Sequence, residues 1–385
     1  MISVLFINYS NELGGAEQSL LSLLSGLDRK RYSPLLLTFG SGPLSQQAAL
    51  AGAEVIALPP LPALLSLRRE GMARRLLARL NQAPALFSRV RGIRRAIRAR
   101  SVDIVHTNNP KSHVLGACAS LFLKKRLVFH MRDIFAAGSF ARFLFSLIGF
   151  LTRPECIAIS SAVRDRLPSS LKKRSRVIVN GVRPPASLRD RREVRASLGI
   201  PGDARIIVSA GRIVPWKGID CLIRAAAPLL KPGECYLVVL GAPLYWDEAY
   251  LAEVKGLARA LSIADCVRFP GWVEDVFSVL NASDLFVLPS RNEPFGRSLV
   301  EAMLCGLPVV AFREAGPLEI VEDRVNGRLV AERTPEALRE AVAALLADMP
   351  AAASMGARGK ASALTRFSLD RMINSVERFY AGAEG

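Results

Sequence analysis

The sequence is poor in the residues from which metal centres and disulfide frameworks are built. Its 385 residues include three histidines and six cysteines, and no two cysteines form a C-x-x-C pair. A zinc site or a disulfide framework is therefore not expected, and scattered thiols suit a reducing compartment. The sequence also lacks an Asp-x-Asp motif, a G-x4-G-K-[ST] loop and a G-x-G-x-x-G loop. We therefore expect no metal-held diphosphate and no P-loop.

Long uninterrupted apolar stretches are missing as well. Arg142 interrupts the apolar segment Ile134–Thr152, well short of the roughly 18–20 uncharged residues of a membrane-spanning helix. Met1–Ser10 has no basic start and no small-residue cleavage site, so no signal peptide is expected. These observations predict a cytoplasmic location.

Charge is abundant but unevenly distributed. The chain carries a net charge of +18, with 32 Lys and Arg against 11 Asp and Glu in residues 1–200, and 20 against 23 in residues 201–385. Half of the residues are apolar, which excludes a disordered chain. We expect the two halves to have different partners, and the basic half to face something anionic.

The order of apolar runs predicts an α/β fold with two doubly wound parallel sheets. Short apolar runs alternate with helical patterns, are interrupted by the Pro- and Arg-rich segment 183–195, which we interpret as a linker, and then resume. Continuous apolar strands of this kind are typical of parallel sheets covered on both faces. We predict an N-terminal Rossmann-like domain over 1–185, a second over 186–365, and a C-terminal helix over 366–385 that packs back on the first. The default ligand site is the cleft between the two domains.

The strongest motif is Glu293-Pro294-Phe295-Gly296, which leads into a helix that contains Glu301. It follows the apolar run 285–288, so the free N–H groups of the first helical turn lie beyond the carboxyl end of a strand. Two carboxylates around such donors can hold a polyhydroxyl, phosphorylated ligand. The alternative is that Glu293 caps the helix and Glu301 is solvated. The strand–turn–helix context favours the ligand site.

A second motif is Gly211-Arg212-Ile213-Val214-Pro215-Trp216-Lys217-Gly218, directly after the run 206–209. An arginine fork and a mobile lysine charge at a strand end can clamp a diphosphate. The alternative is an ordinary network of surface ion pairs. A third and weaker signal is Gly14-Gly15 after the first strand, where paired glycines permit close approach of a ligand or simply make a turn.

Together these blocks resemble the retaining GT-B glycosyltransferases of family 4, also called group 1. The resemblance covers nearly the whole chain and rests on Gly14-Gly15, the G-R-x4-K-G block at 211–218 and the E-x7-E block at 293–301. Residues 316–321 and 326–327 also match. One departure is Ala315-Gly316, where family members often have two glycines. The resemblance implies the GT-B fold, two Rossmann-like domains facing across a cleft.

The resemblance also implies roles for individual residues. Arg212 and Lys217 would hold the donor's diphosphate, assisted by the backbone of Gly14 and Gly15. Glu301 would accept hydrogen bonds from the ribose, and Glu293 from the donor sugar. The remaining implied positions are backbone N–H groups at Phe295 and Gly296, a base-binding segment that includes Phe269, Gly271 and Val273, and a histidine near the reaction centre, His130.

The activity implied is transfer of a sugar, with retention, from a nucleotide-diphosphate sugar, UDP- or GDP-linked, to a glycan or lipid-linked acceptor. No cofactor and no metal are expected. Two alternatives remain: a GT-B-shaped epimerase or phosphorylase, and a basic nucleic-acid-binding protein. The second leaves the motifs at 211–218 and 293–301 unexplained, so nucleic acid is not the expected partner.

Segment 68–100 predicts one or two basic amphipathic helices. It carries eleven arginines and one acid, Glu70, interleaved with leucines and other apolar residues. Such a helix can lie on an anionic membrane, follow nucleic-acid phosphates or be a solvated basic face. The aromatic-rich segment 136–151 favours the membrane. We therefore expect peripheral attachment to the inner face of the cell membrane.

Overall fold

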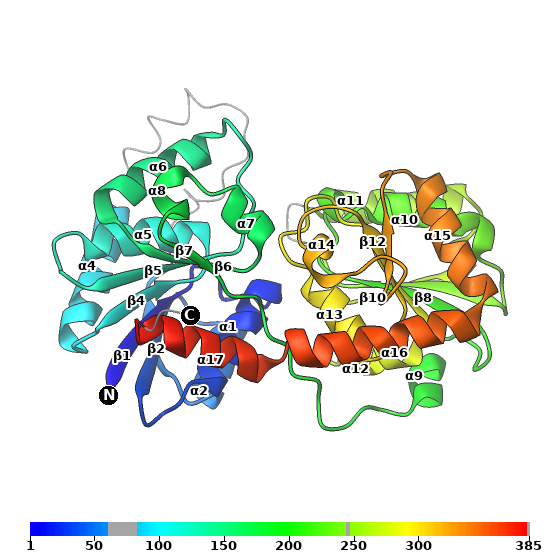
Figure 1. Ribbon diagram of the computed structural model, residues 1–385, viewed down its shortest axis with the longest axis horizontal. Coiled ribbons are helices and arrows are strands. Elements are labelled where there is room, and N and C mark those ends of the chain that lie inside the picture. The colour runs from blue at the N-terminus through cyan, green and yellow to red at the C-terminus, as the bar shows by residue number, and fades with distance from the viewer. Residues whose placement is uncertain (61–82, 244–246, 383–385) are drawn as a thin grey trace. The chain divides into compact units, whose positions relative to one another are not determined.

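The computed structural model describes residues 1–60, 83–243 and 247–382. The chain divides into two compact units, Met1–Val179 with Met372–Gly385, and Asn180–Arg371. We call them the N-terminal unit and the C-terminal unit. Each is a parallel β-sheet with helices on both faces (Figure 1), the architecture predicted from the alternating apolar runs.

The N-terminal unit contains a seven-stranded parallel sheet in the order β3-β2-β1-β4-β5-β6-β7. Figure 1 shows α1, α2 and α17 on one face and α5, α6 and α8 on the other. Its elements are β1 (Ile2–Ile7), α1 (Gly15–Gly26), β2 (Tyr32–Phe39), α2 (Pro43–Leu50), β3 (Glu54–Leu58), α4 (Ala83–Ala99), β4 (Ile104–Thr107), α5 (Pro110–Ser120), β5 (Arg126–Met131), α6 (Phe140–Thr152), β6 (Glu155–Ala158), α7 (Ser161–Asp165), α8 (Ser169–Lys172), β7 (Ser175–Val177) and most of α17 (Leu369–Tyr380).

The C-terminal unit contains a six-stranded parallel sheet in the order β10-β9-β8-β11-β12-β13. Strand order reverses between β8 and β11, and such reversal points are where open α/β sheets bind ligands. Its elements are α9 (Arg191–Ser197), β8 (Arg205–Ala210), α10 (Ile219–Ala226), β9 (Cys235–Leu240), α11 (Glu248–Ala260), β10 (Val267–Gly271), α12 (Val276–Ala282), β11 (Leu285–Leu288), α13 (Arg297–Leu304), β12 (Val309–Phe312), α14 (Pro317–Ile320), β13 (Arg328–Val330), α15 (Pro335–Ala347) and α16 (Met349–Arg366).

The strands are buried for the reason that their composition predicts. Val4, Leu5, Phe6 and Ile7 of β1 are all 0% exposed, since helices cover both faces of the sheet. Continuous apolar runs are therefore needed in place of alternating ones. The same holds for the central strands of the C-terminal unit. The two strongest sequence motifs, at 211–218 and 293–301, begin beyond the carboxyl ends of such buried strands.

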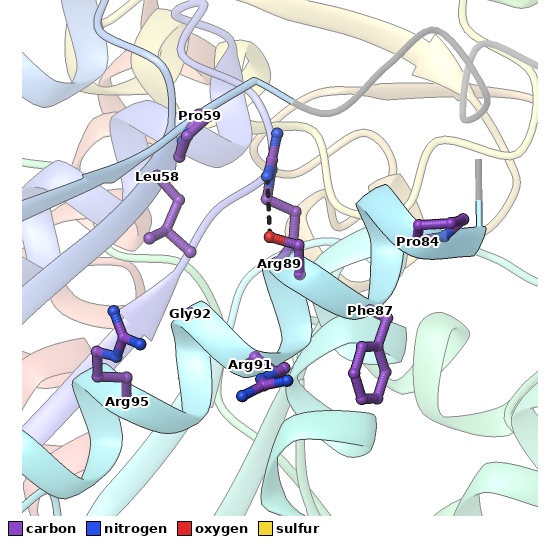
Figure 2. A pocket seen from close by; sticks show the side chains of 9 residues that line it. Leu58, Pro59, Pro84, Phe87, Arg89, Arg91, Gly92 and Arg95 are labelled. Carbon is purple, nitrogen blue, oxygen red and sulfur yellow. Dashed lines mark hydrogen bonds between the residues drawn. The ribbon is translucent and has the colours of Figure 1, made fainter. Parts of the chain in front are cut away.

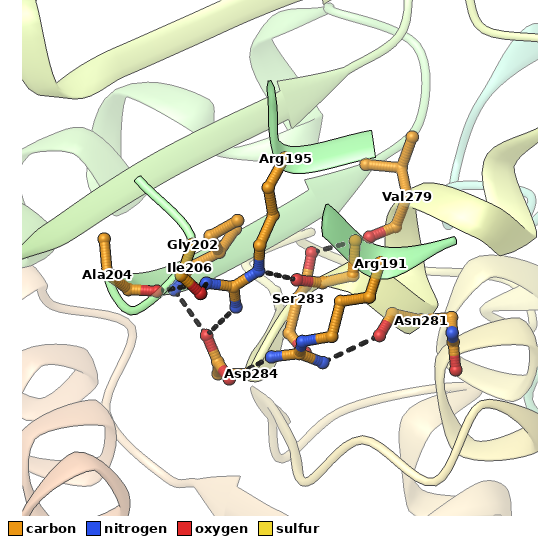
Figure 3. A network of polar contacts seen from close by, with 10 residues as sticks. Arg191, Arg195, Gly202, Ala204, Ile206, Val279, Asn281, Ser283 and Asp284 are labelled. Atoms are coloured by element: carbon orange, nitrogen blue, oxygen red, sulfur yellow. Dashed lines mark hydrogen bonds and ion pairs between the residues drawn. The ribbon is translucent and has the colours of Figure 1, made fainter. Parts of the chain in front are cut away.

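The predicted linker over 183–195 is wrong in its second part, because residues from Arg191 onward form α9. Asp190 caps this helix, its side chain accepting hydrogen bonds from the N–H groups of Arg192 and Glu193. Figure 3 shows Arg191 and Arg195 of α9 reaching Asp284, with N–O distances of 2.6 and 2.8 Å. Helix α9 is thus an integral part of the C-terminal unit.

The unit boundaries also differ by a few residues from the predicted ones at 185 and 365. The N–H of Val182 donates to the carbonyl of Phe367 at 2.9 Å, and Arg183 pairs with Asp370 at 2.6 Å. These contacts join the two chain segments within the C-terminal unit. Of the predicted basic segment 68–100, residues 83–99 form α4, and residues 68–82 lie outside the described residues.

Candidate donor-binding site

The two strongest sequence motifs lie on either side of the reversal point in the C-terminal sheet. Residues 211–218 follow β8, and residues 289–296 follow β11. The N–H of Arg291 donates to the carbonyl of Trp216 at 2.8 Å. Gly218 has φ of +69°, and a Cβ there would lie 2.2 Å from the carbonyl oxygen of Pro289. Only glycine fits this close approach, so the two loops are packed against each other.

Lys217 and Glu293 join the two motifs directly. The Lys217 Nζ lies 2.6 Å from Glu293 Oε2, and their side chains are 14% and 9% exposed. Lys217 Nζ also lies 4.5 Å from the centre of the Trp216 ring. Arg212 is exposed and has no ion pair or hydrogen bond within the described residues. The guanidinium that the sequence predicts as half of a diphosphate clamp is therefore free to bind.

Glu301 lies in α13 and pairs with Arg297 of the same helix at 2.8 Å. Burial raises the pKa of the Glu301 carboxyl, and the Arg297 charge opposes this rise. Each glutamate of the E-x7-E block thus uses one oxygen for a cation. Among the residues described, Glu293 Oε1 and Glu301 Oε2 accept no hydrogen bond. Both remain acceptors for hydroxyl groups.

The turn into α13 requires its glycine. Gly296 has φ of +102° and precedes the first helical residue. Phe295 is 2% exposed and packs its ring 5.8 Å from that of Phe367. Its side chain therefore anchors the turn, and only its backbone is left for a ligand. The N–H of Gly316 donates to the carbonyl of Glu293 at 2.9 Å, which fixes the loop from the far side.

Ala315 marks the departure from the family pattern. Its φ is +50°, a left-handed conformation that favours glycine. A Cβ at Gly316 would lie 2.4 Å from the carbonyl oxygen of Phe295. The second glycine of the pair is thus sterically required. The first is a conformational preference that alanine satisfies at a cost of about 1–2 kcal/mol.

The predicted base-binding segment lies at the next strand ends along the same edge. The N–H of Gly211 donates to the carbonyl of Leu240 at 3.0 Å, and the N–H of Gly241 to the carbonyl of Gly271 at 2.8 Å. Backbone hydrogen bonds therefore hold the carboxyl ends of β8, β9 and β10 side by side, and the loops that follow them start at the same edge of the sheet. Phe269 and Val273 are half-buried and Trp272 is 52% exposed, so this segment has a partly exposed aromatic surface.

In the N-terminal unit, Gly14 and Gly15 lie between β1 and α1. Gly14 is extended, and Gly15 begins the helix. A Cβ at Gly15 would meet no atom within 4 Å, and one at Gly14 would lie 3.0 Å from Glu17 Oε2. Neither position needs glycine for its backbone conformation. The space above Gly15 is open, as the prediction of a close ligand approach requires.

His130, on β5, is buried in a polar cluster of the N-terminal unit. It is 1% exposed, and its Nδ1 lies 3.1 Å from His106 Nε2 and 3.5 Å from Arg132 Nη2. Burial and the nearby Arg132 charge lower the pKa of His130 well below its usual value, so the ring is neutral. His106 and Tyr380, which complete this cluster, are not found by sequence reasoning.

Arg297 was also missed as a site residue, although its i,i+4 spacing to Glu301 is a readable helix pairing signal. Within residues 1–60, 83–243 and 247–382, no group of three His, Cys, Asp or Glu side chains is arranged to hold a metal. No helix in the same ranges is long and apolar enough to cross a membrane.

Two family models match the chain. Residues 13–184 match "Glycosyltransferase Family 4" and residues 190–362 match "Glycosyl transferases group 1". A D-inositol 3-phosphate glycosyltransferase of Saccharomonospora viridis is 38% identical over 202 residues, 50% of this chain and 46% of that protein. The lipopolysaccharide core biosynthesis glycosyltransferase LpsE of Rhizobium meliloti is 34% identical over 187 residues, 49% of this chain and 53% of that protein. These alignments span about half the length of the curated relatives.

A solved structure matches at full length. Anabaena HepE in complex with UDP-glucose is 26% identical with a TM-score of 0.83, over 99% of this chain and 100% of that chain. The similarity covers both sheets of this chain. The chain belongs to the family 4, or group 1, glycosyltransferases and has their GT-B fold of two Rossmann-like domains.

Proposed function

We propose that the protein transfers a sugar from a nucleotide-diphosphate sugar to an acceptor, with retention at the anomeric carbon. The observation that carries this proposal is the arrangement after β8 and β11. Two carboxylates each keep one oxygen open, Lys217 pairs with one of them, and Arg212 is exposed on the same loop as Lys217. Hydroxyls of the ribose and the sugar would donate to Glu301 and Glu293, and the diphosphate would be held by Arg212 and Lys217.

The reaction breaks the bond between the anomeric carbon and the diphosphate, so negative charge develops on the leaving group. Fixed cations and amide donors that stabilise such charge are worth about 10²–10³-fold in rate for each donor. Lys217 is held in place by Glu293, and a ligand phosphate would compete for its ammonium. We propose that these two cations serve the leaving group without a metal, so chelators should leave turnover unchanged.

We propose a UDP-sugar as donor. The Anabaena HepE structures that resemble this chain contain UDP and UDP-glucose. The aromatic segment after β10 suits stacking of a base. A GDP-sugar is the second candidate, and the experiment below separates the two.

A thermal-shift panel of UDP-, GDP- and ADP-sugars tests donor binding. A ligand at 100 times its Kd stabilises the protein by about 2.7 kcal/mol, which shifts the melting temperature measurably. We expect Arg212→Ala and Glu301→Ala to abolish the shift, and Arg224→Ala, which removes an exposed arginine of α10, to retain it. No response to any sugar nucleotide contradicts the proposal. Release of isomerised donor or sugar phosphate in place of transfer would identify an epimerase or a phosphorylase.

We further propose that the acceptor is a lipid-linked or cell-surface glycan precursor at the cytoplasmic face of the membrane. Helix α6 supports this through one exposed apolar face. Phe140, Phe143 and Phe150 are 76%, 67% and 72% exposed, and Leu147 and Leu151 lie on the same side of the helix. Phe145 is buried on the other side, 5.0 Å from the ring of Phe135. A soluble surface rarely gathers five large apolar side chains on one helix.

Helix α4 adds positive charge to the same unit. A hollow of about 380 Å³ lies beside it. Its lining includes Leu58, Phe87 and three arginines, Arg89, Arg91 and Arg95 (Figure 2). Arg91 stacks over the Phe87 ring at 5.7 Å. Anionic headgroups would bind these guanidinium groups while phenylalanines enter the interface.

Flotation with vesicles of anionic or neutral lipid tests this attachment. We expect binding to anionic vesicles that weakens with salt, and a clear loss in the double variant Phe143→Ser with Phe150→Ser. Phe122→Ser is the matched control, because Phe122 is 93% exposed but lies outside α6. Equal binding to both vesicle types, or equal loss in the control, would count against the proposal.

A further inference from the structure

A chain of buried side chains in the N-terminal unit connects α17 to His130. Tyr380 lies at the end of α17, and its hydroxyl oxygen is 2.7 Å from His106 Nδ1. His106 Nε2 is in turn 3.1 Å from His130 Nδ1. All three side chains are at most 2% exposed. These residues lie far apart in the sequence, so tertiary structure alone assembles the chain.

Arg132 determines the direction of the hydrogen bonds. Its Nη2 lies 3.5 Å from His130 Nδ1, and a guanidinium can only donate. His130 Nδ1 must therefore be an acceptor, and His106 Nε2 must carry the proton that it donates to this atom. A neutral His106 then accepts at Nδ1, where the Tyr380 hydroxyl donates. Every member of the chain has one consistent role.

The last atom of the chain is left with a proton and no partner. With Nδ1 of a neutral His130 accepting, its Nε2 carries the hydrogen. His130 Nε2 is buried and has no hydrogen-bond partner among the residues that the structure describes. Buried donors are nearly always paired in proteins. An unpaired N–H held in this way points to a ligand atom as its missing acceptor.

We propose that Tyr380 and His106 are positioning residues that hold His130 as its neutral Nε2–H tautomer, ready to donate a hydrogen bond to a substrate oxygen. The inference rests on the proposed sugar transfer for its functional part only. The tautomers themselves can be measured without any substrate.

Helix α17 is anchored firmly enough to serve this purpose. Glu377 accepts a hydrogen bond from the N–H of Asp28 at 2.9 Å, and the Tyr32 hydroxyl donates to the Glu377 carbonyl at 3.2 Å. Arg126 donates to the carbonyls of both Phe379 and Tyr380. These contacts hold the backbone of the last turn of α17, and so they fix the position from which the Tyr380 side chain extends to His106.

The chain has only three histidines, so long-range ¹H–¹⁵N spectra of histidine-labelled protein test the tautomers directly. We expect both His106 and His130 as the Nε2–H form. In Tyr380→Phe the ring packing stays but the donor to His106 is lost, so His106 can move its proton to Nδ1 and accept at Nε2. His130 can then donate from Nδ1 to His106, opposed by the long 3.5 Å contact from Arg132, so a partial Nδ1–H population should appear at His130. We expect kcat to fall roughly 10-fold, as for other partners that orient a functional histidine, with the donor KM within about twofold.

Tyr236→Phe is the matched control. It removes the hydroxyl of a second buried tyrosine, which lies in β9 of the C-terminal unit and accepts a hydrogen bond from the N–H of Gly233 at 3.0 Å, without touching the histidines or α17. Its tautomers and kcat should equal those of the wild type. An Nδ1–H form of His130 in the wild type overturns the inference, as does a Tyr380→Phe variant whose spectra and kcat are unchanged. If the wild-type spectra show the expected tautomers but the protein has no transferase activity, the tautomer assignment stands and only the proposed function is refuted.

Discussion

At the scale of single residues, the proposed donor site is a set of paired charges that still has open positions. Lys217 with Glu293 and Arg297 with Glu301 satisfy each other in part. Each pair is nearly buried, where an uncompensated charge would be costly. The pairing keeps the side chains ordered without a ligand, and each carboxylate retains one oxygen for a hydroxyl group.

Donor binding should weaken in acid at a higher pH than an ordinary glutamate would give. Burial raises the pKa of Glu301 above its usual value of 4.5. As pH falls through this raised pKa, the carboxylate takes up a proton and would lose its proposed role as acceptor for the ribose. We expect calorimetric titrations with a UDP-sugar to show the loss of affinity beginning above the usual glutamate range. Glu301→Gln should bind more weakly and with little dependence on pH in this range. An equal pH dependence in both proteins contradicts the assignment.

Gly15→Ala separates a ligand contact from a structural glycine. An added Cβ meets no atom within 4 Å, and alanine is the better helix former by about 1 kcal/mol. We expect thermal stability to stay equal or to rise. The apparent affinity for the donor should fall about 10-fold or more, because the methyl group occupies the space that a phosphate would need. Unchanged affinity in steady-state kinetics would show that the glycine only makes the turn.

At the scale of the secondary-structure elements, α9 shows how buried charge holds the C-terminal sheet together. Arg195 is 2% exposed and donates to the carbonyls of Gly202, Ala204 and Ala282, as well as to Asp284 (Figure 3). Asp284 also accepts from the N–H of Ile206 at 2.8 Å. This network ties α9 to the start of β8 and the end of α12.

Asp284→Asn should therefore destabilise the protein severely. It leaves the Arg195 charge buried without its counter-charge, and such broken pairs cost about 3–5 kcal/mol. Urea unfolding measures the change. The control Glu234→Gln removes one partner of an exposed pair, in which both side chains are more than 65% exposed, and should be nearly neutral. A small effect of Asp284→Asn would mean that water or other groups compensate Arg195.

At the scale of the whole molecule, the chain passes from one unit to the other and returns. Residues from Met372 onward belong to the N-terminal unit. Ile373 of α17 is 6% exposed, and a Cβ on Gly26 of α1 would lie 1.9 Å from its Cδ1. The glycine thus creates the space into which the returning helix packs.

Ile373→Ala should weaken the N-terminal unit alone. Removing a buried isoleucine side chain costs about 2–5 kcal/mol, and the loss falls on α1, β2 and α17. We expect faster hydrogen exchange in peptides from these elements, with β8 and β11 unchanged. Asn374→Ala, on the exposed side of α17, is the control and should exchange like the wild type. Equal loosening of both units would show that they unfold as one.

The features that sequence reasoning predicted correctly depend on residues close together in the chain. Two doubly wound sheets follow from apolar runs and the turns between them. The two motifs of the proposed donor site could be placed because each spans about ten residues around one strand end, and their role in donor binding stays a prediction. Even Arg297 was within reach, since it lies one helical turn before Glu301.

Other features depend on contacts between distant segments, and no local pattern contains them. His130 is connected through His106 to Tyr380, which lies 250 positions later in the sequence. Arg195 finds Asp284 89 positions away. Strand order, the partners of buried polar groups and the tautomer of a histidine arise only when the sheets and helices pack. Local physics therefore specified the elements and their motifs, while the burial of distant side chains against each other established which of them act together.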